Sequence, residues 1–253
     1  MDISLSFIIP NLNSGGLLKQ TIISIISKQF ECNYEVIVVD GLSSDGSIDF
    51  IEDLKYINIV TNKEKDINVY DAMNKGINLS RGEWLIFIGA GDTITDLLPK
   101  INLELYRQFK LIYGNVFWVS KNLIYDGPFT LRKLFYKNIC QQAIIYNRIC
   151  FDNATFFNLK YFINADYEFN LNLFIDYFKD VSFVNILMCN YNGNGISHYN
   201  SDLFSKFKNN HILKKLYFSK SYNNKVLFFQ YILVLSFNKI LIYTRLIYLF
   251  KRS

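Results

Sequence analysis

Apolar and polar positions along the first ninety residues repeat in the order buried strand, polar loop, helix. Apolar runs at 5–9, 34–39 and 84–88 show little polar alternation, as expected for strands buried on both faces of a sheet. Apolar residues at helical spacing predict helices at 17–29 and 69–79. This order predicts right-handed crossovers and an α/β fold with a mainly parallel central sheet flanked by helices.

The pattern is less regular elsewhere. We expect a short helix at 48–54, a strand at 57–61, a helix at 97–109 and a strand at 111–116, and we interpret 120–154 as irregular. A helix should begin near Asn164, and a strand should cover 184–189. No internal repeat or low-complexity linker divides the chain, so one domain over about 1–200 with a carboxyl-terminal appendage is the simplest division.

The net charge of +5 hides an uneven distribution. Residues 203–253 hold ten Lys and Arg and no acid, which leaves 17 bases against 22 acids, a net −5, for the rest of the chain. The segment 225–250 is largely apolar, but Asn238, Lys239 and Arg245 interrupt it, so we do not expect a single-pass span.

Two interpretations of this basic, apolar tail stay open. It suits the anionic inner leaflet of a membrane, which attracts Lys and Arg, or it forms helices packed on the domain or a homodimer contact. We favour peripheral membrane association. Nucleic acid would also attract the charge, but no recognised nucleic-acid motif accompanies it, so we expect no nucleic-acid partner.

The cysteines and the amino terminus favour a cytoplasmic chain. Cys32, Cys140, Cys150 and Cys189 are scattered without a CxxC pair, which argues against both a disulfide framework and a zinc site. The first residues lack the basic region of a secretory signal.

Candidate chemistry lies where the predicted strands end. After 84–88 the chain continues Gly89-Ala90-Gly91-Asp92, which lets the backbone turn sharply and places one carboxylate at the edge where α/β sheets bind ligands. Asp92 is therefore a candidate ligand for Mg²⁺ or Mn²⁺, although an Asp there also suits a helix cap.

Two further polar loops follow the first two strands, at 10–16 and 40–47. Each by itself fits ordinary turn or cap chemistry. At adjacent strand ends, however, a helix amino terminus and the carboxylate of Asp40 could receive a phosphate and a nucleoside. Asp71, Asn74 and Lys75 lie three and four residues apart, so on a helix they share one face.

Taken together, four segments resemble family 2 glycosyltransferases in order and spacing. They read FIIPNLN at 7–13, VVDGLSSDG at 38–46, YDAMNKG at 70–76 and GEWLIFIGAGD at 82–92. The resemblance covers about 4–200 and implies a GT-A fold, a nucleotide-sugar donor that is usually a UDP-sugar, and inversion at the anomeric carbon. It implies that the nucleotide sugar is bound by Pro10, Asn11, Asn13, Asp40, Ser43 and Asp66, with Asp71 and Lys75 nearer the ribose and diphosphate.

By the same resemblance Asp92 would be the ligand of a divalent metal, Mn²⁺ or Mg²⁺. Many relatives carry two or three acids here, whereas this chain has Gly89 and Gly91. Family metals are held mainly by the diphosphate, so one carboxylate can suffice. The missing acids also motivate an alternative, a catalytically silent nucleotide-sugar-binding partner of another transferase. A nucleotidyltransferase would need a basic, Gly-rich triphosphate loop, which this chain lacks.

Inverting transfer also needs a base that takes the proton of the acceptor hydroxyl. The resemblance places this acid at the start of a late helix, where Asp166 falls, with Glu168 as the fallback; without the family context Asp166 would be read as an ordinary acid at a helix amino terminus. The remaining substrate-binding candidates are Gln141, Gln142, Gly89, Gly91, Tyr167 and His198.

The sequence therefore predicts an inverting hexosyl- or N-acetylhexosaminyl-transferase. We expect it to extend a lipid-linked saccharide in bacterial O-antigen or capsule biosynthesis at the inner face of the cell membrane. Its donor part would cover about 1–118, its acceptor part about 119–200, and the tail 201–253.

Overall fold

The computed structural model describes residues 3–54, 58–134, 137–154 and 156–193. The chain divides into two compact units, Met1–Asp202 and Leu203–Ser253, and all described residues belong to the first. The basic tail and His198 lie outside the described residues, so their expected roles stay predictions. None of the helices in the described part has the length and hydrophobicity to cross a bilayer.

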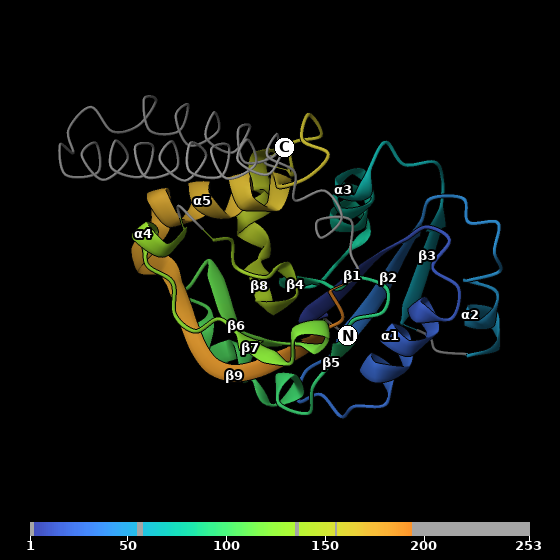
Figure 1. Cartoon of the computed structure of the whole chain (residues 1–253), viewed down its shortest axis with the longest axis horizontal. Helices are drawn as coiled ribbons and strands as arrows, with labels where there is room; N and C mark the ends of the chain where they lie inside the picture. The colour runs from blue at the N-terminus through green and yellow to red at the C-terminus, as the bar shows by residue number, and fades with distance from the viewer. Residues whose placement is uncertain (1–2, 55–57, 135–136, 155, 194–253) are drawn as a thin grey trace, which may run out of the picture. The chain divides into compact units, whose positions relative to one another are not determined.

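One mixed sheet of nine strands organises the described residues (Figure 1). Its strands are β1 (Leu5–Asn11), β2 (Tyr34–Asp40), β3 (Ile59–Lys63), β4 (Trp84–Phe87), β5 (Thr93–Ile94), β6 (Leu111–Trp118), β7 (Leu123–Tyr125), β8 (Ile144–Asn147) and β9 (Val181–Tyr191). They lie in the order β3-β2-β1-β4-β8-β6-β9-β5, and β7 pairs with β6.

The expected parallel pairing holds on one side of the sheet. β3, β2, β1 and β4 are parallel neighbours, and β1, β2 and β4 are apolar and buried almost throughout. Because parallel strands end at the same edge, the loops after β1, β2 and β4 are brought together. We refer to residues 3–92 as the parallel half.

Beyond β4 the sheet is mixed, and we refer to residues 93–193 as the mixed half. β8 pairs antiparallel with β4 on one side and with β6 on the other. β9 runs parallel to β6 through two register shifts and then pairs with β5, and Figure 1 shows how strongly it curves.

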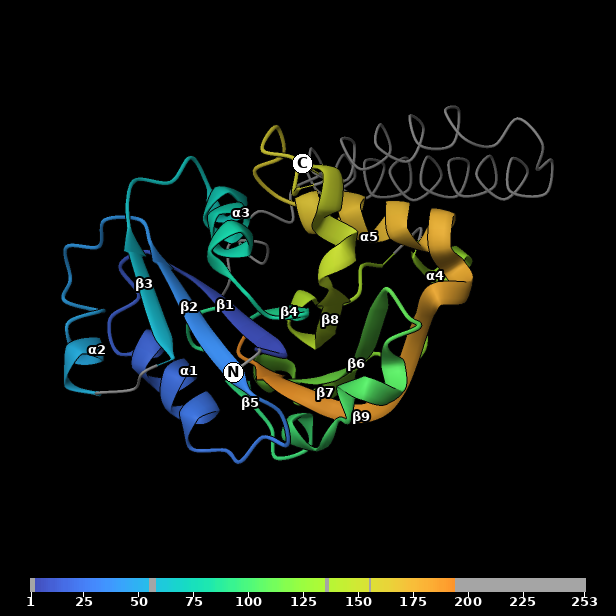
Figure 2. The same ribbon diagram turned by 180° about the vertical axis from the view of Figure 1, so that it is seen from behind.

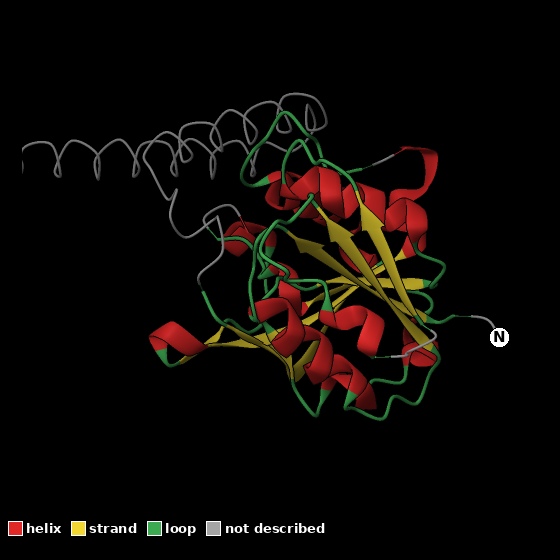
Figure 3. Cartoon of the chain, turned by 90° about the vertical axis from the view of Figure 1, so that its right-hand side faces the viewer, coloured by secondary structure: helices red, strands yellow, loops and turns green. Residues whose placement is uncertain are grey.

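Helices cover both faces of the sheet (Figure 3). The α-helices are α1 (Leu17–Ile26), α2 (Phe50–Asp53), α3 (Val69–Leu79), α4 (Leu131–Leu134) and α5 (Ala165–Tyr177). In the reverse view α1 and α2 lie on one side of the sheet, and α3 and α5 lie on the other (Figure 2). α1 buries Leu18, Ile22 and Ile25 at helical spacing, and this apolar stripe fixes which face meets the sheet.

Short 3₁₀ helices connect the larger elements: η1 (Leu98–Lys100), η2 (Leu103–Tyr106), η3 (Val119–Lys121), η4 (Gln141–Ala143), η5 (Arg148–Ala154) and η6 (Phe178–Asp180). The expected helix at 97–109 was wrong, because η1 and η2 occupy this stretch instead. The side chain of Asn102 accepts a hydrogen bond from the Glu104 backbone N–H, and such local bonds compete with a continuous helix.

The interpretation of 120–154 as irregular was also wrong in part. It contains β8, which lies inside the sheet between β4 and β6. Four residues are too few to show a period, so the long-range pairing of Ile86 with Ile145 and of Ile112 with Ile145 determines this strand.

Candidate active site

The loops after β1 and β2 are joined by a buried hydrogen-bond network around Asp40. The side-chain amide of Asn11 donates to Asp40 Oδ1 at 2.6 Å and to Ser47 Oγ at 3.0 Å. The Ser43 hydroxyl donates to Asp40 Oδ1 at 2.6 Å, and the Ser43 backbone N–H donates to Asp40 Oδ2 at 2.9 Å. Both carboxylate oxygens are thus used inside the protein, and only 1% of Asp40 is exposed. Asp40 therefore shapes the loop 40–47, which we call the nucleoside loop after its predicted role, and is not free to bind a base.

A second set of bonds fixes the rim of this loop. The Asn13 backbone N–H donates to Ser43 Oγ at 2.8 Å, and the Ser44 backbone N–H donates to Asn13 Oδ1 at 2.9 Å. Leu42, between these contacts, has a left-handed φ of 68° and is 57% exposed. A leucine in this conformation is uncommon and persists only where its surroundings hold it.

Pro10 lies inside a strand, where a proline normally removes a ladder bond. Pairing of β1 with β4 ends at Ile8 and Phe87, and the Ile8 carbonyl accepts from the Ile88 N–H at 3.0 Å on that side. The backbone N–H and C=O groups of residues two apart in a strand point toward the same neighbouring strand. The backbone nitrogen of Pro10 therefore faces the side of β4, and β4 has ended before that position. The proline therefore costs no ladder bond.

Lys75 stands among three carboxylates. Its ammonium lies 2.7 Å from Asp66 Oδ1, 3.2 Å from Glu64 Oε1 and 3.3 Å from Asp71 Oδ2, and these acids raise its pKa although burial lowers it. The pKa of Asp66 is raised, chiefly by burial. The cluster therefore offers carboxylate oxygens near the nucleoside loop. The positive charge of Lys75 is already neutralised by these acids and is not available to a diphosphate.

Asp66 reaches the nucleoside loop directly. A Cβ added to Gly41 would lie 3.0 Å from Asp66 Oδ2 and 3.3 Å from Leu12 Cδ1. Leu12 is 61% exposed. A carboxylate and an exposed aliphatic side chain thus flank a bare backbone position, an arrangement suited to the edge and face of a nucleobase.

The Gly89–Asp92 turn is held by α1. Thr21 Oγ1 donates to the Asp92 carbonyl at 2.8 Å and accepts from the Gly91 N–H at 2.9 Å. Gly91 has φ 98°, which favours glycine. A Cβ on Gly89 would lie 2.8 Å from Asp92 Oδ2, so glycine there lets the carboxylate fold back over the turn. The two glycines shape the position of Asp92.

The carboxylate of Asp92 accepts hydrogen bonds from two N–H donors. Gln142 Nε2 donates to Oδ2 at 2.7 Å, and the Asn192 backbone N–H donates to Oδ1 at 2.8 Å. Burial raises the pKa of Asp92 to about 6, and these bonds oppose the shift.

Asp166, in the first turn of α5, is held by two other donors. The Tyr70 hydroxyl donates to Oδ1 at 2.7 Å, and Asn138 Nδ2 donates to Oδ2 at 2.6 Å. Burial raises the pKa of Asp166, and both bonds counteract it. The carboxylate is therefore oriented at both oxygens and its ionised form is the one that these donors favour.

One segment spans both acids. Asn138 contacts Asp166 and Gln142 contacts Asp92, and four residues of chain span at most about 14 Å. Between them, the Cys140 thiol has a pKa raised first by burial and then by the charges of both Asp92 and Asp166. The structure thus brings the two acids to the same region, although they are far apart in the sequence.

The other acceptor-side candidates divide into two kinds. Gln141 Nε2 is buried without a hydrogen-bond partner among the described residues, which leaves it available to a substrate hydroxyl. The Tyr167 hydroxyl instead donates to the Leu134 carbonyl at 2.7 Å, and Tyr167 is 4% exposed. Tyr167 therefore packs inside the domain, and its position argues against the predicted substrate contact.

Four side chains or backbone groups that hold the acids were missed by sequence reasoning: Tyr70, Asn138, Thr21 and the Asn192 N–H. Tyr70 lies inside the recognised YDAMNKG segment, so its position was a usable signal. Asn138 and Asn192 gave none, because nothing in their local sequence indicates which carboxylate they meet.

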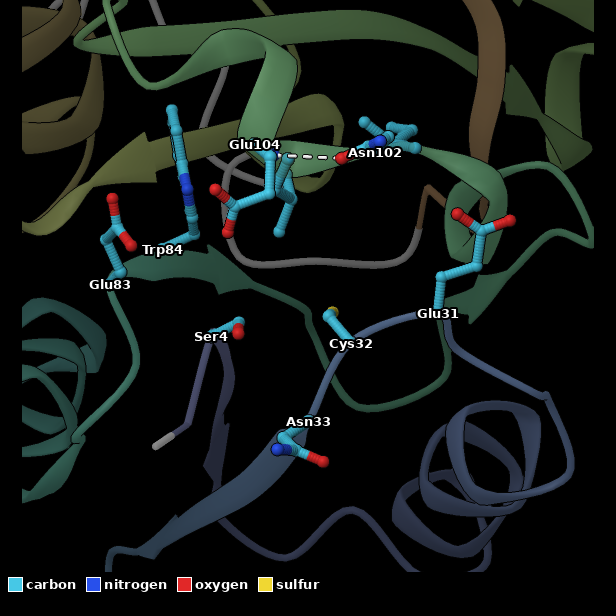
Figure 4. Close-up of a pocket in the computed structure, with 10 residues that line it drawn as sticks. Ser4, Glu31, Cys32, Asn33, Glu83, Trp84, Asn102 and Glu104 are labelled. Atoms are coloured by element: carbon cyan, nitrogen blue, oxygen red, sulfur yellow. Dashed lines mark hydrogen bonds between the residues drawn. The ribbon is translucent and has the colours of Figure 1, made fainter. Parts of the chain in front are cut away.

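A cavity of about 340 Å³ lies elsewhere (Figure 4). Asn33 and Trp84, which line it, stand at the amino ends of β2 and β4, the edge opposite the candidate site. Two of its carboxylates, Glu83 and Glu104, pair with Arg107, at 3.0 and 2.9 Å. This cavity is separate from the chemistry described above.

Asp92 fits a metal that is bound mainly by the substrate. Among the described residues no group of three or more His, Cys, Asp or Glu is arranged as a metal site. A carboxylate has about four lone-pair positions, and two are used by Gln142 and Asn192. Asp92 can therefore supply one hard oxygen ligand.

Comparison with known proteins shows the class. Residues 6–164 match glycosyl transferase family 2. The chain is 35% identical over 196 residues to a PGL/p-HBAD biosynthesis glycosyltransferase of Mycobacterium bovis, covering 74% of this chain and 76% of the relative. The chain belongs to glycosyl transferase family 2 and is a glycosyltransferase.

A second relative and two solved structures agree. A dolichyl N-acetyl-alpha-D-glucosaminyl phosphate 3-beta-D-2,3-diacetamido-2,3-dideoxy-beta-D-glucuronosyltransferase of Methanococcus voltae is 25% identical over 223 residues, 77% of this chain and 69% of the relative. S. aureus TarS 1-349 in complex with UDP has a TM-score of 0.65 at 18% identity, covering 88% of this chain and 74% of TarS 1-349. The mannosyltransferase PcManGT of Pyrobaculum calidifontis, in complex with GDP-Man and Mn²⁺, has a TM-score of 0.62 at 12% identity, covering 89% and 66%. These likenesses confirm the GT-A-like fold.

Proposed function

We propose that this glycosyltransferase moves a sugar, with inversion, from a UDP-sugar to a lipid-linked saccharide in bacterial surface-polysaccharide biosynthesis. The observation that carries the proposal is the placement of Asp92 and Asp166 at the two ends of the segment 138–142. An inverting transfer needs stabilisation of the leaving diphosphate on one side of the sugar and a base on the other.

Asp166 is the base in this proposal. Its carboxylate takes the proton of the acceptor hydroxyl as that oxygen forms the new bond to the anomeric carbon and the diphosphate departs. Tyr70 and Asn138 hold it in one orientation. Gln141, with its unpaired buried amide nitrogen, would bind an acceptor or sugar hydroxyl.

Asp92 would hold a divalent metal, Mn²⁺ or Mg²⁺, which when bound offsets charge on the diphosphate. Gln142 and the Asn192 N–H orient Asp92. The exposed Leu12 and the Asp66 carboxylate would receive the base, because a carboxylate accepts the N–H of uracil.

Two observations support the lipid-linked acceptor. The Methanococcus relative is named for a dolichyl-linked substrate, and the ten basic residues of 203–253 suit an anionic membrane surface. We therefore place the enzyme at the inner face of the membrane.

A panel of UDP- and GDP-sugars tests the proposal. Purified full-length protein with Mn²⁺ should release the nucleotide from one UDP-sugar, and Asp166→Asn should not. Release from GDP-sugars alone would overturn the UDP assignment. UDP binding without turnover of any donor or acceptor would contradict the proposed transfer from a UDP-sugar.

A further inference from the structure

Asp166 is a carboxylate in a setting that works against its ionised form. Burial is the largest influence on its pKa and raises it. A general base must be ionised to accept a proton, so something in the structure has to offset burial at this position.

None of the main influences on the pKa of Asp166 is a cation. The ionisable side chains that interact electrostatically with it include Tyr70 on α3, Tyr125 on β7, Cys140 in the segment 138–142 and Tyr146 on β8. Burial raises the pKa of each of these four groups. They therefore stay neutral and contribute no positive charge, and hydrogen bonds must support the carboxylate.

The backbone N–H groups of Asp166 and Tyr167, at the start of α5, supply part of this support. Two side chains supply the rest, one to each oxygen. The Tyr70 hydroxyl is 2.7 Å from Oδ1, and Asn138 Nδ2 is 2.6 Å from Oδ2. They come from different parts of the fold: α3 belongs to the parallel half, whereas Asn138 belongs to the mixed half. Asp166 is thus held between the two halves.

Tyr70 has a second contact that fixes the helix carrying Asp166. Its hydroxyl oxygen accepts from the Asn164 backbone N–H at 2.9 Å. The Asn164 side chain makes no cap bond to α5, and helix amino termini have unpaired N–H groups. One hydroxyl therefore accepts a free N–H at the start of α5 and donates to the carboxylate two residues later.

Asn138 is held in turn by its neighbours. Asn170 Nδ2 donates to Asn138 Oδ1 at 3.2 Å, and the Tyr146 hydroxyl donates to Asn170 Oδ1 at 2.7 Å. With its oxygen occupied in this way, the amide nitrogen of Asn138 is turned toward Asp166. The donor is therefore preorganised.

From this geometry we propose that Tyr70 and Asn138 are positioning residues that keep the Asp166 carboxylate ionised and aimed for proton transfer. The proposal deepens the proposed function and rests on Asp166 as the base. Hydrogen bonds to the charged form lower a carboxyl pKa, so removing either donor should raise the pKa of Asp166 by about one unit.

The pKa can be measured without turnover. In full-length protein labelled with ¹³C at the aspartate carboxyl, the Asp166 signal is the one missing from Asp166→Asn. Titration should give a pKa about one unit higher in Tyr70→Phe and in Asn138→Leu than in the wild type. A shift in only one variant would overturn the role of the other residue, and no shift in either would overturn the proposal.

Tyr113→Phe is the matched control. Tyr113 is also buried, and its hydroxyl accepts only the Phe129 backbone N–H, at 2.7 Å, among the hydrogen bonds of the described residues. This variant should leave the Asp166 pKa unchanged. If Tyr70→Phe does not fold, Asn138→Leu still decides whether donors to the carboxylate set its pKa.

Kinetics separate this proposal from the proposed function. With a donor that is turned over, the acid limb of the kcat/KM profile should move to higher pH in Tyr70→Phe by the same amount as the pKa. Full activity of Asp166→Asn would remove the base role, whatever the titration shows. Loss of activity in Asp166→Asn with an unmoved profile in both donor variants would overturn only the positioning.

Discussion

The two halves of the domain place their functional groups in different ways. In the parallel half, strands β1, β2 and β4 end at one edge, and their loops meet because the backbone register brings them together. In the mixed half, the site residues are held by side-chain bonds to the parallel half. Examples are Asp166 to Tyr70 at 2.7 Å and Gln142 to Asp92 at 2.7 Å.

The two halves should therefore respond differently when the hydrogen bonds between them are removed. The nucleoside loop should keep its shape when the bonds between the halves are cut, since its network closes within the parallel half around Asp40. The acceptor side should lose its geometry first. Nucleotide binding and transfer are therefore separable by mutation.

The largest effect is expected inside the parallel half, at Asp40. Asp40→Ala removes the acceptor of three hydrogen bonds, from the buried Asn11 amide and from the half-buried Ser43 hydroxyl and N–H, which should lower the free energy of unfolding by about 3 kcal/mol. UDP affinity should fall by at least about tenfold, because the loop must be ordered again on binding and a cost of about 1.4 kcal/mol corresponds to a tenfold change in affinity. Urea denaturation and calorimetric titration with UDP measure the two effects.

Asp53→Ala is the control for this change. Asp53 is exposed on the short helix α2, so the same loss of charge there should leave both quantities unchanged. Unaltered UDP binding in Asp40→Ala would show that the loop does not depend on this network.

A smaller effect that depends on pH is expected at Glu35, on the far side of the same half. Glu35 is fully buried and accepts from Ser6 Oγ at 2.7 Å and from Arg81 N at 2.6 Å. Burial raises its pKa, but these bonds and the Arg81 charge together lower it by a larger amount, so the net pKa is below the usual value. Glu35→Gln should cost about 2 kcal/mol at pH 7.

The sign of the pH dependence follows from this lowered pKa. A carboxyl group that is more acidic in the folded state stabilises the fold above its unfolded pKa, and this contribution is lost as pH falls through the folded pKa. The difference in unfolding free energy between wild type and Glu35→Gln should therefore stay constant from pH 7 down to the ordinary pKa of 4.5 and shrink as pH is lowered further toward 3. A difference that stayed constant over the whole range would contradict the ion pair as its cause.

The smallest effect on stability is expected between the halves, at Asn74. Its amide donates to the Phe157 carbonyl at 2.9 Å and accepts from the Phe157 N–H at 3.0 Å. Asn74→Leu should cost about 1–2 kcal/mol and speed amide exchange near Phe157, while UDP affinity stays within about twofold of wild type. The exposed Asn78 on the same helix provides the control Asn78→Leu.

Loss of UDP binding in Asn74→Leu, without loss in Asn78→Leu, would show that the nucleoside loop depends on the mixed half. The comparison between the halves would then fail.

The same difference explains what the sequence could predict. The parallel half follows from local patterns: apolar runs, turn residues at strand ends, and the Asn68 side chain that accepts from Tyr70 N and Asp71 N at the start of α3. The family-like segments are also concentrated there. Strand β8 could not be predicted, because its four residues become a strand only between β4 and β6.

The candidate site was predictable to the same degree. Asp92 and Asp166 were identified from position and resemblance, and the structure brings them to one region. Which groups hold them depends on pairs up to a hundred residues apart, such as the Asn192 N–H with Asp92. The burial of Asp40 and the three acids around Lys75 also needed coordinates, since a sequence does not show which polar atoms meet.

The most direct test of the account compares two properties of Asp166→Asn in the full-length protein. UDP affinity, measured by calorimetric titration, should stay within about twofold of wild type, while release of UDP from the preferred donor should fall by about a thousandfold. Wild-type turnover, or equal loss of binding and turnover, would contradict the account.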